Sequence, residues 1–97
     1  MPAKVRFHPA AAEEAEAAYR WYHERSPSAS SAFLAALERA VLLISEAPER
    51  PAAYLHETRR VLLRRFPFMI VYRVAGDEVQ VISVAHGRRR PGYWRAR

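Results

Sequence analysis

The pattern of apolar and polar residues predicts a short strand and then two helices in the first half of the chain. Residues 4–7 alternate polar and apolar side chains, as a strand does. From Ala10 to Arg25 the apolar residues recur at helical spacing, behind a proline suited to a first helical turn. Ser26 and Pro27 repeat this start signal, and the apolar stripe of the second helix consists of Phe33, Leu34, Leu37, Val41 and Ile44. The connection is short, so the helices are expected to form an antiparallel hairpin that ends at Pro48.

The second half of the chain predicts three strands. After a polar, proline-containing loop at residues 48–58, runs rich in branched and aromatic residues cover 59–65, 68–74 and 78–86. Turn-forming residues separate these runs, so the strands are expected to form an antiparallel meander. The order β-α-α-β-β-β predicts a two-layer α+β fold, with the helical hairpin on one face of a mainly antiparallel four-stranded sheet. The opposite face is expected to stay partly open, and the first strand can pair at either edge.

Length and composition favour one soluble domain without a bound cofactor. A chain of 97 residues fits a single domain, residues 1–97. Cysteine is absent and the four histidines are scattered, so we expect no disulfide, no metal and no cofactor. No apolar run approaches the roughly 20 residues that cross a bilayer, and the N-terminal residues lack the apolar core of a secretory signal. A cytoplasmic protein with no membrane partner is expected.

The charge is concentrated in one half of the chain. Residues 1–49 carry five basic and seven acidic side chains, whereas residues 50–97 carry eleven basic and three acidic ones. All but one of the basic residues are arginine, the side chain best suited to bidentate pairing with phosphate or carboxylate groups. This distribution predicts a polyanionic partner, either a nucleic acid, a nucleoprotein or an acidic protein segment.

Three groups of residues are expected on the open face of the sheet and after its final strand. One comprises Arg59, Arg60, Arg64 and Arg65, the second is Arg73, and the third comprises His86, Arg88, Arg89, Arg90, Tyr93 and Trp94. Arginines beside aromatic rings suit contact with nucleic acid, and arginine, histidine and tyrosine together suffice for RNA cleavage without a metal. In the alternative interpretation, the arginines keep the strands soluble, and Tyr93 and Trp94 dock the C-terminal segment against the helices.

Motifs spread over nearly the whole chain resemble those of the RelE/ParE superfamily of bacterial type II toxins, also called plasmid stabilisation proteins. They begin with residues 5–10 (VRFHPA), Trp21-Tyr22 and Arg59-Arg60, and continue through residues 65–74 (RFPFMIVYRV). They end with residues 84–89 (VAHGRR) and with Pro91, Tyr93, Trp94 and Arg97. The resemblance implies the same helical hairpin on an antiparallel sheet, and a cognate antitoxin that holds the toxin inactive.

The resemblance implies different targets for the two branches of the superfamily. RelE-like members cut messenger RNA in the ribosome, whereas ParE-like members inhibit DNA gyrase without known catalytic chemistry. Met69 stands where nuclease members resemble one another in an arginine, and this favours the ParE branch. If the chain is a metal-free, ribosome-dependent endoribonuclease instead, its catalytic residues would be Arg60, Arg73, His86, Arg88 and Tyr93. In either branch, Arg59, Arg64, Arg65, Arg89, Arg90 and Trp94 are expected to contact target or antitoxin, and a non-toxic basic interaction domain is the third alternative.

Overall fold

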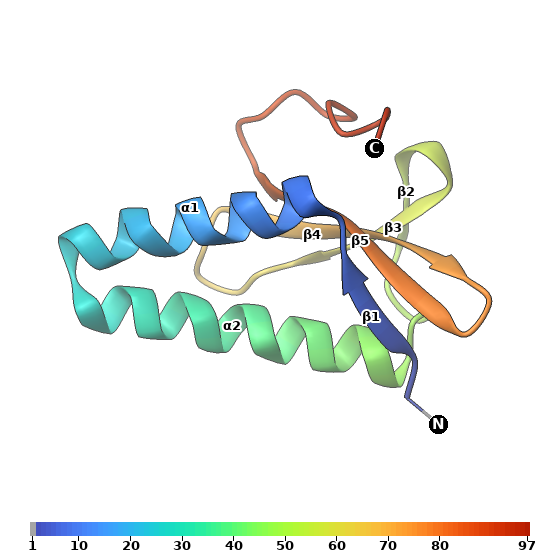
Figure 1. The fold of residues 1–97 in the computed structure, drawn as a ribbon, viewed down its shortest axis with the longest axis horizontal. Coiled ribbons are helices and arrows are strands. Elements are labelled where there is room, and N and C mark those ends of the chain that lie inside the picture. The colour runs from blue at the N-terminus through green and yellow to red at the C-terminus, as the bar shows by residue number, and fades with distance from the viewer. Residues whose placement is uncertain (1) are drawn as a thin grey trace.

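The computed structural model describes residues 2–97 and has two layers, a helical hairpin and a mixed five-stranded sheet (Figure 1). The predicted α+β class and the order of the main elements are confirmed. The elements in chain order are β1 (Lys4–Phe7), α1 (Pro9–Arg25), α2 (Pro27–Glu46), β2 (Ala53–Tyr54), a short 3-10 helix (Leu55–Glu57), β3 (Thr58–Leu62), β4 (Phe68–Ala75) and β5 (Glu78–His86).

Both helices begin with a side-chain cap followed by proline. The Ala10 amide donates to Nδ1 of His8 at 3.0 Å, and the Ala29 amide donates to Oγ of Ser26 at 3.4 Å. Pro9 and Pro27 then occupy the first helical turns, where a missing N–H costs no hydrogen bond. Ser26 also ends α1, since its amide donates to the Tyr22 carbonyl at 2.8 Å. One residue therefore separates the helices, and they run antiparallel (Figure 1).

The strand order is β1-β5-β4-β3-β2. This order assigns the first strand to the edge beside β5, where it runs parallel to β5 and ends with Phe7 opposite Val81. The sheet has five strands and not four, because two residues of the predicted loop, Ala53 and Tyr54, pair with β3. The β4–β5 ladder is antiparallel and contains a bulge at Val71/Tyr72.

The main core lies between the helical hairpin and the sheet. Phe33 and Ile44 of α2 are fully buried there against Ile70 and Tyr72 of β4. The Tyr22, Phe33, Phe66 and Phe68 rings pack together at the end of the hairpin near residue 26, with centroids 5.1–6.4 Å apart. Leu34 departs from the predicted stripe, because it faces away from the sheet and is 41% exposed.

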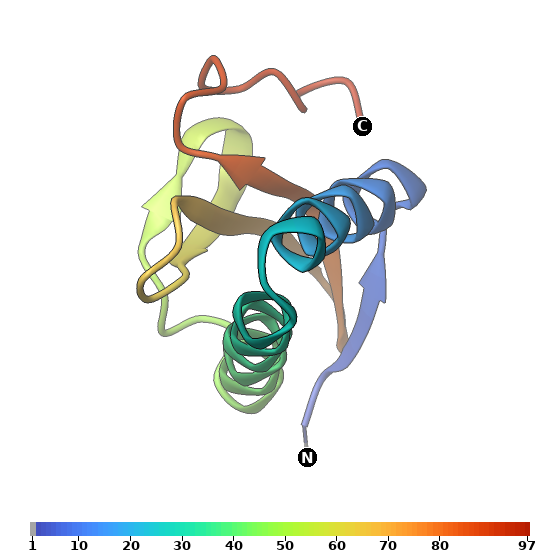
Figure 2. The same ribbon diagram turned by 90° about the vertical axis from the view of Figure 1, so that its left-hand side faces the viewer.

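A second core covers part of the face of the sheet that was expected to stay partly open. The C-terminal segment after β5 turns back over this face (Figures 1 and 2). The Trp94 side chain is 1% exposed and packs with Met69, Val71, Ile82 and Ala85. Burial of these apolar side chains against an indole drives the segment onto the sheet. The face is therefore closed by the C-terminal segment over these residues.

Within residues 2–97, α2 is the one helix long and apolar enough to cross a membrane by length and composition. The expectation that no such run exists is therefore wrong on these two criteria. However, the Phe33, Leu37, Ala40 and Ile44 side chains of this helix lie in the main core. A core helix of a folded domain meets the same two criteria, so meeting them is weak evidence that α2 crosses a membrane.

Candidate functional site

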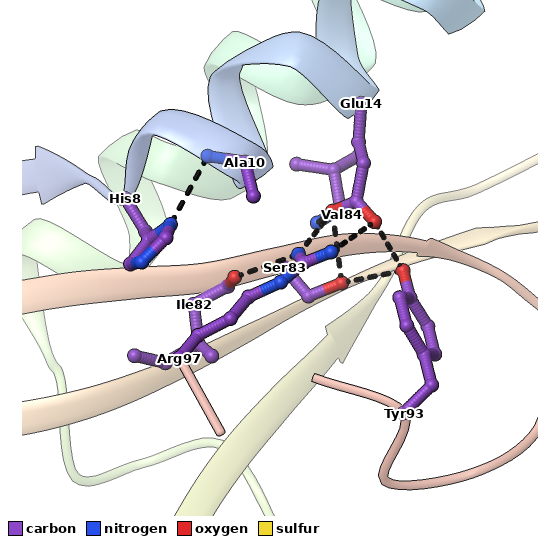
Figure 3. A network of polar contacts seen from close by, with 8 residues as sticks. All are labelled: His8, Ala10, Glu14, Ile82, Ser83, Val84, Tyr93 and Arg97. Atoms are coloured by element: carbon purple, nitrogen blue, oxygen red, sulfur yellow. Dashed lines mark hydrogen bonds and ion pairs between the residues drawn. The ribbon is translucent and has the colours of Figure 1, made fainter. Parts of the chain in front are cut away.

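A network of polar contacts joins α1, β5 and the C-terminal segment (Figure 3). The Glu14 carboxylate on α1 is at its centre. Its Oε1 accepts hydrogen bonds from the Ser83 hydroxyl at 3.1 Å, the Val84 amide at 3.0 Å and Nη1 of Arg97 at 2.8 Å. Its Oε2 accepts from the Tyr93 hydroxyl and from Nη2 of Arg97 at 3.1 Å. Five donors on β5 and the C-terminal segment thus converge on one carboxylate.

The network satisfies the edge of β5 beyond the end of β1. The His8 amide donates to the Val81 carbonyl at 2.8 Å, the last backbone hydrogen bond from the β1 side. Farther along β5, Nη1 of Arg97 donates to the Ile82 carbonyl at 3.2 Å, and the Val84 amide donates to Glu14. Side chains therefore replace a neighbouring strand along this part of the edge, where unpaired backbone groups would destabilise the fold.

The protonation states of the network follow from its contacts. Burial raises the pKa of Glu14. Hydrogen bonds from Arg97, Tyr93 and Val84, together with the charge of Arg97, lower it by more than burial raises it, so the net pKa lies below the usual value. Burial raises the pKa of the Tyr93 phenol, and its hydrogen bond to the Glu14 carboxylate adds to this. The network is thus a carboxylate, a guanidinium and a neutral phenol at neutral pH.

The groups proposed for RNA cleavage do not all come together. Phe68 pairs with His86, and Arg73 pairs with Gln80, so five positions of β4 place Arg73 about 17 Å along the strand from the His86 end. Nδ1 of His86 accepts a hydrogen bond from the Arg88 amide at 3.0 Å. Arg60 lies on β3 with its guanidinium 4.3 Å from the Tyr54 ring centroid.

The remaining arginines occupy different surroundings. Arg59 is partly buried and donates to the Pro51 carbonyl at 2.7 Å, which holds the loop after α2 against β3. The side chains of Arg64, Arg65, Arg88, Arg89 and Arg90 are exposed on two adjacent turns. Trp94 does not offer a surface to a partner, because it fills the second core. Tyr93 docks against Glu14 of α1, in agreement with the alternative interpretation of this residue.

Next to the network, α1 and the C-terminal segment enclose an apolar groove of about 420 Å³. Ala18, Trp21 and Tyr22 line it from the helix, and His86 and Arg89 line it from the other side. Trp21 is 51% exposed, and the Arg25 guanidinium lies 3.5 Å from its ring centroid. The groove can accept an apolar side chain, with positive charge at its rim.

Sequence analysis did not identify Glu14 or Ser83 as site residues. Glu14 stands among other acidic residues near the start of α1, where carboxylates are favoured by the helix dipole alone. Its partners lie 69 to 83 residues farther along the chain. A contact between residues this far apart leaves no pattern in the neighbouring sequence from which it could be predicted.

Comparison with known proteins agrees with this fold. A family model described as the ParE toxin of type II toxin-antitoxin systems, parDE, matches residues 5–91. A solved structure described as the chromosomal ParDE toxin-antitoxin system from P. aeruginosa superposes with a TM-score of 0.75. That match has 20% sequence identity and covers 87% of this chain and 95% of the other, which establishes a shared fold. No curated protein sequence matches this chain.

The two-layer fold and the matched residues define a type II toxin of the RelE/ParE superfamily. Because the family model matches most of its length, the chain belongs to the ParE toxin family. This confirms the resemblance stated from the sequence and its assignment to the ParE branch.

Proposed function

We propose that this toxin inhibits DNA gyrase by binding to it, without catalytic chemistry of its own, and that a cognate antitoxin neutralises it. Membership of the ParE family supports the class of target and the presence of an antitoxin. The P. aeruginosa protein of the same fold is described as part of a ParDE system, which is a toxin–antitoxin pair. We propose that this chain is likewise the toxin of such a pair.

The hydrogen bonds of the Tyr93 hydroxyl are the observation that favours a binding function over RNA cleavage. Its hydroxyl donates to Glu14 and also lies 2.8 Å from Oγ of Ser83. Burial and the neighbouring carboxylate raise its pKa, so the phenolate that a general base requires is disfavoured at neutral pH. Tyr93 therefore acts as a structural residue in this proposal.

Met69 and Arg73 support the same choice. Met69 is 9% exposed and packs in the second core with Trp94, and a thioether cannot stabilise negative charge that develops on phosphorus. Arg73 is separated from His86 along β4, so these two side chains do not act on one phosphate. The exposed arginines are then available for binding an acidic protein surface.

Inducing the protein in a bacterial host without its antitoxin tests the proposal. Thymidine incorporation is expected to fall first while amino-acid incorporation continues, and the purified toxin is expected to inhibit supercoiling by gyrase. Translation arrest that precedes the loss of DNA synthesis would instead identify the RelE-like nuclease. If neither synthesis changes, the chain is the non-toxic interaction domain.

The double variant Arg73→Ala/Tyr93→Phe separates binding from catalysis. Its toxicity is expected to persist in proportion to the folded fraction, which circular dichroism measures because Tyr93→Phe also weakens the Glu14 network. The single variant Arg73→Ala is the matched control with an intact network. Complete loss of toxicity in a fully folded double variant contradicts the binding proposal.

A further inference from the structure

The outward face of α2 carries apolar side chains that the core of the domain does not use. Phe33 and Ile44 point from the inner face of this helix into the main core. Within residues 2–97 no other element lies over the opposite side of the helix (Figures 1 and 2). Leu42 and Leu43 are nevertheless 58% and 42% exposed. Adjacent exposed leucines on an uncovered helix are typical of a surface that meets another chain.

The apolar surface continues from Leu42 into a groove between α2 and β1. This groove has a volume of about 480 Å³. Val5 and Phe7 line it from the strand, and Leu37 and Val41 line it from the helix together with Leu42. Another molecule placed against Leu42 would also cover part of the groove, and this increases the apolar area that a contact can remove from water.

Two opposite charges flank the exposed leucines. Arg39 and Glu46 are exposed on α2, and neither takes part in an ion pair within residues 2–97. The positions three and four residues after Arg39, and three and four before Glu46, are both Leu42 and Leu43. These are the positions at which a helix pairs opposite charges. Arg39 and Glu46 lie about 10 Å apart along the axis, so they do not pair with each other within one helix.

Glu46 also stands at the unfavourable end of α2. It is the last residue of the helix, and the last turn contains no basic side chain. The carbonyl groups at a helix C-terminus repel a carboxylate and favour a cation. A guanidinium supplied by another chain would compensate this local conflict, whereas a residue selected for the stability of the helix alone would be basic or neutral.

The arrangement of these four side chains is complementary to itself. The same spacing of three separates Arg39 from Leu42 and Leu43 from Glu46. If two copies of α2 lie antiparallel about a two-fold axis between Leu42 and Leu43, each leucine meets a leucine of the second copy. Arg39 of each copy then meets Glu46 of the other. A surface that matches itself in this way is what a closed two-fold interface requires.

The same charges make other occupants of this face unfavourable. A nucleic acid needs a surplus of positive charge, whereas this face has one arginine and one glutamate. A helix that lies on a membrane carries its charges on the face opposite to its apolar side chains. On α2, however, Arg39 and Glu46 share a face with the exposed leucines. A second copy of the chain pairs both charges and covers both leucines.

We propose that two copies of this toxin associate through the outward faces of their α2 helices, which pack antiparallel with Leu42 and Leu43 at the centre and an Arg39–Glu46 ion pair on each side. A single helix contact buries less area than the roughly 1,600 Å² of a standard stable interface, so a Kd of about 10–100 μM is expected. The C-terminal segment lies on the opposite side of the molecule from α2 (Figure 2), and its exposed arginines stay accessible in the pair. The proposal does not depend on gyrase or on an antitoxin.

Sedimentation equilibrium of the full toxin, purified without any other protein, tests the association. Between about 1 μM and 1 mM the mean mass is expected to rise from that of one chain towards that of two and to stop there. A toxin that stays monomeric over this range would overturn the proposal. Growth beyond two chains would also overturn it, because a two-fold contact closes after one pairing. The toxicity and gyrase assays are separate measurements, so their failure would leave this result unaffected.

Charge reversal tests the pairing across the interface. Arg39→Glu and Glu46→Arg are each expected to weaken self-association at least tenfold, because symmetry places two like-charge contacts in every pair. The double variant Arg39→Glu/Glu46→Arg restores opposite charges and is expected to associate within about threefold of the parent chain. Glu24→Arg is the matched control, since Glu24 is an exposed glutamate on α1. It is expected to associate normally. Two weak single variants without recovery in the double variant would overturn the antiparallel pairing.

Leu42→Ser tests the apolar centre and is expected to weaken self-association at least tenfold. Its matched control is Leu62→Ser, because Leu62 is a 66% exposed leucine on β3, outside the proposed interface. Circular dichroism shows whether each variant is folded, and Glu46→Arg serves if Leu42→Ser is not, since it places a favourable charge at the end of α2. Normal association of Leu42→Ser, or loss of association only in Leu62→Ser, would overturn the proposal. A monomeric toxin whose α2 instead binds anionic lipid vesicles or the acidic protein encoded beside the toxin gene would also overturn it.

Discussion

The Glu14 carboxylate and the Arg97 guanidinium form a two-point contact across 83 positions of the chain, with N–O distances of 2.8 and 3.1 Å. Their side chains are 16% and 20% exposed. The contact fixes the C-terminal segment to α1 and keeps Trp94 over the sheet. It therefore links the first helix to the second core.

Glu14→Gln is expected to lower the free energy of unfolding by about 2 kcal/mol, because it leaves the Arg97 guanidinium partly buried without a counter-charge. Urea denaturation followed by circular dichroism measures the loss. Glu16→Gln is the matched control, since the Glu16–Arg20 pair on the same helix is 72% and 65% exposed. The control is expected to change stability by less than about 0.5 kcal/mol. Equal losses in the two variants would contradict the structural role of Glu14.

Acid is expected to weaken the same contact. The pKa of Glu14 is lower in the folded chain than its usual value of 4.5, so the folded state binds fewer protons than the unfolded state in that range. The contribution of Glu14 is present above pH 4.5 and is lost as the pH falls through the folded pKa. Urea midpoints between about pH 2.5 and 6, values chosen to bracket this range, are expected to fall less steeply in Glu14→Gln than in the parent chain. Identical slopes would contradict the lowered pKa.

The helices and the meander are predictable from sequence because their signals are local. Pro9 and Pro27 follow cap residues at the two helix starts, and the Phe33 to Ile44 stripe repeats at helical spacing. The tight turns between the last three strands likewise depend on adjacent residues. Each of these features is determined within a few positions of the chain.

The rest of the fold depends on contacts between distant residues. The position of β1 at one edge of the sheet is determined by its pairing with Val79 and Val81, which lie more than 70 positions away in the chain. Trp94 has the same sequence signal whether it is an exposed aromatic residue for binding or a buried one. The outcome is determined by the distant residues it packs with, which are Met69, Val71, Ile82 and Ala85. The candidate site was incompletely predicted for the same reason, because Glu14 acts through partners on another element.

Trp94→Ala is expected to destabilise the chain by about 3 kcal/mol or more, because it leaves a large cavity in the second core. Trp21→Ala is the matched control, since that indole is 51% exposed against 1% for Trp94. The control is expected to lose about 1 kcal/mol or less. Both values come from urea denaturation followed by the helical signal in circular dichroism. A small loss for Trp94→Ala would mean that the C-terminal segment does not hold the sheet face.

Gly92→Ala is expected to destabilise the chain more than Gly76→Ala. Both glycines have left-handed φ angles, +80° and +64°, which an alanine adopts at a cost of about 1 kcal/mol. A Cβ at Gly76 meets open space, whereas a Cβ at Gly92 lies 3.2 Å from Nε2 of His56. We expect losses of about 1 kcal/mol for Gly76→Ala and about 2 kcal/mol for Gly92→Ala.

The close approach to His56 predicts coupling between the two positions. The His56 ring centroid lies 5.9 Å from that of Trp94, so the imidazole is held between the buried indole and the turn at Gly92. In a double-mutant cycle, His56→Ala combined with Gly92→Ala is expected to lose less stability than the two single losses together, by about 0.5 to 1 kcal/mol. Gly76→Ala combined with His56→Ala is the control and is expected to be additive. Additivity in both cycles would mean that the cost at Gly92 comes from its backbone angle alone.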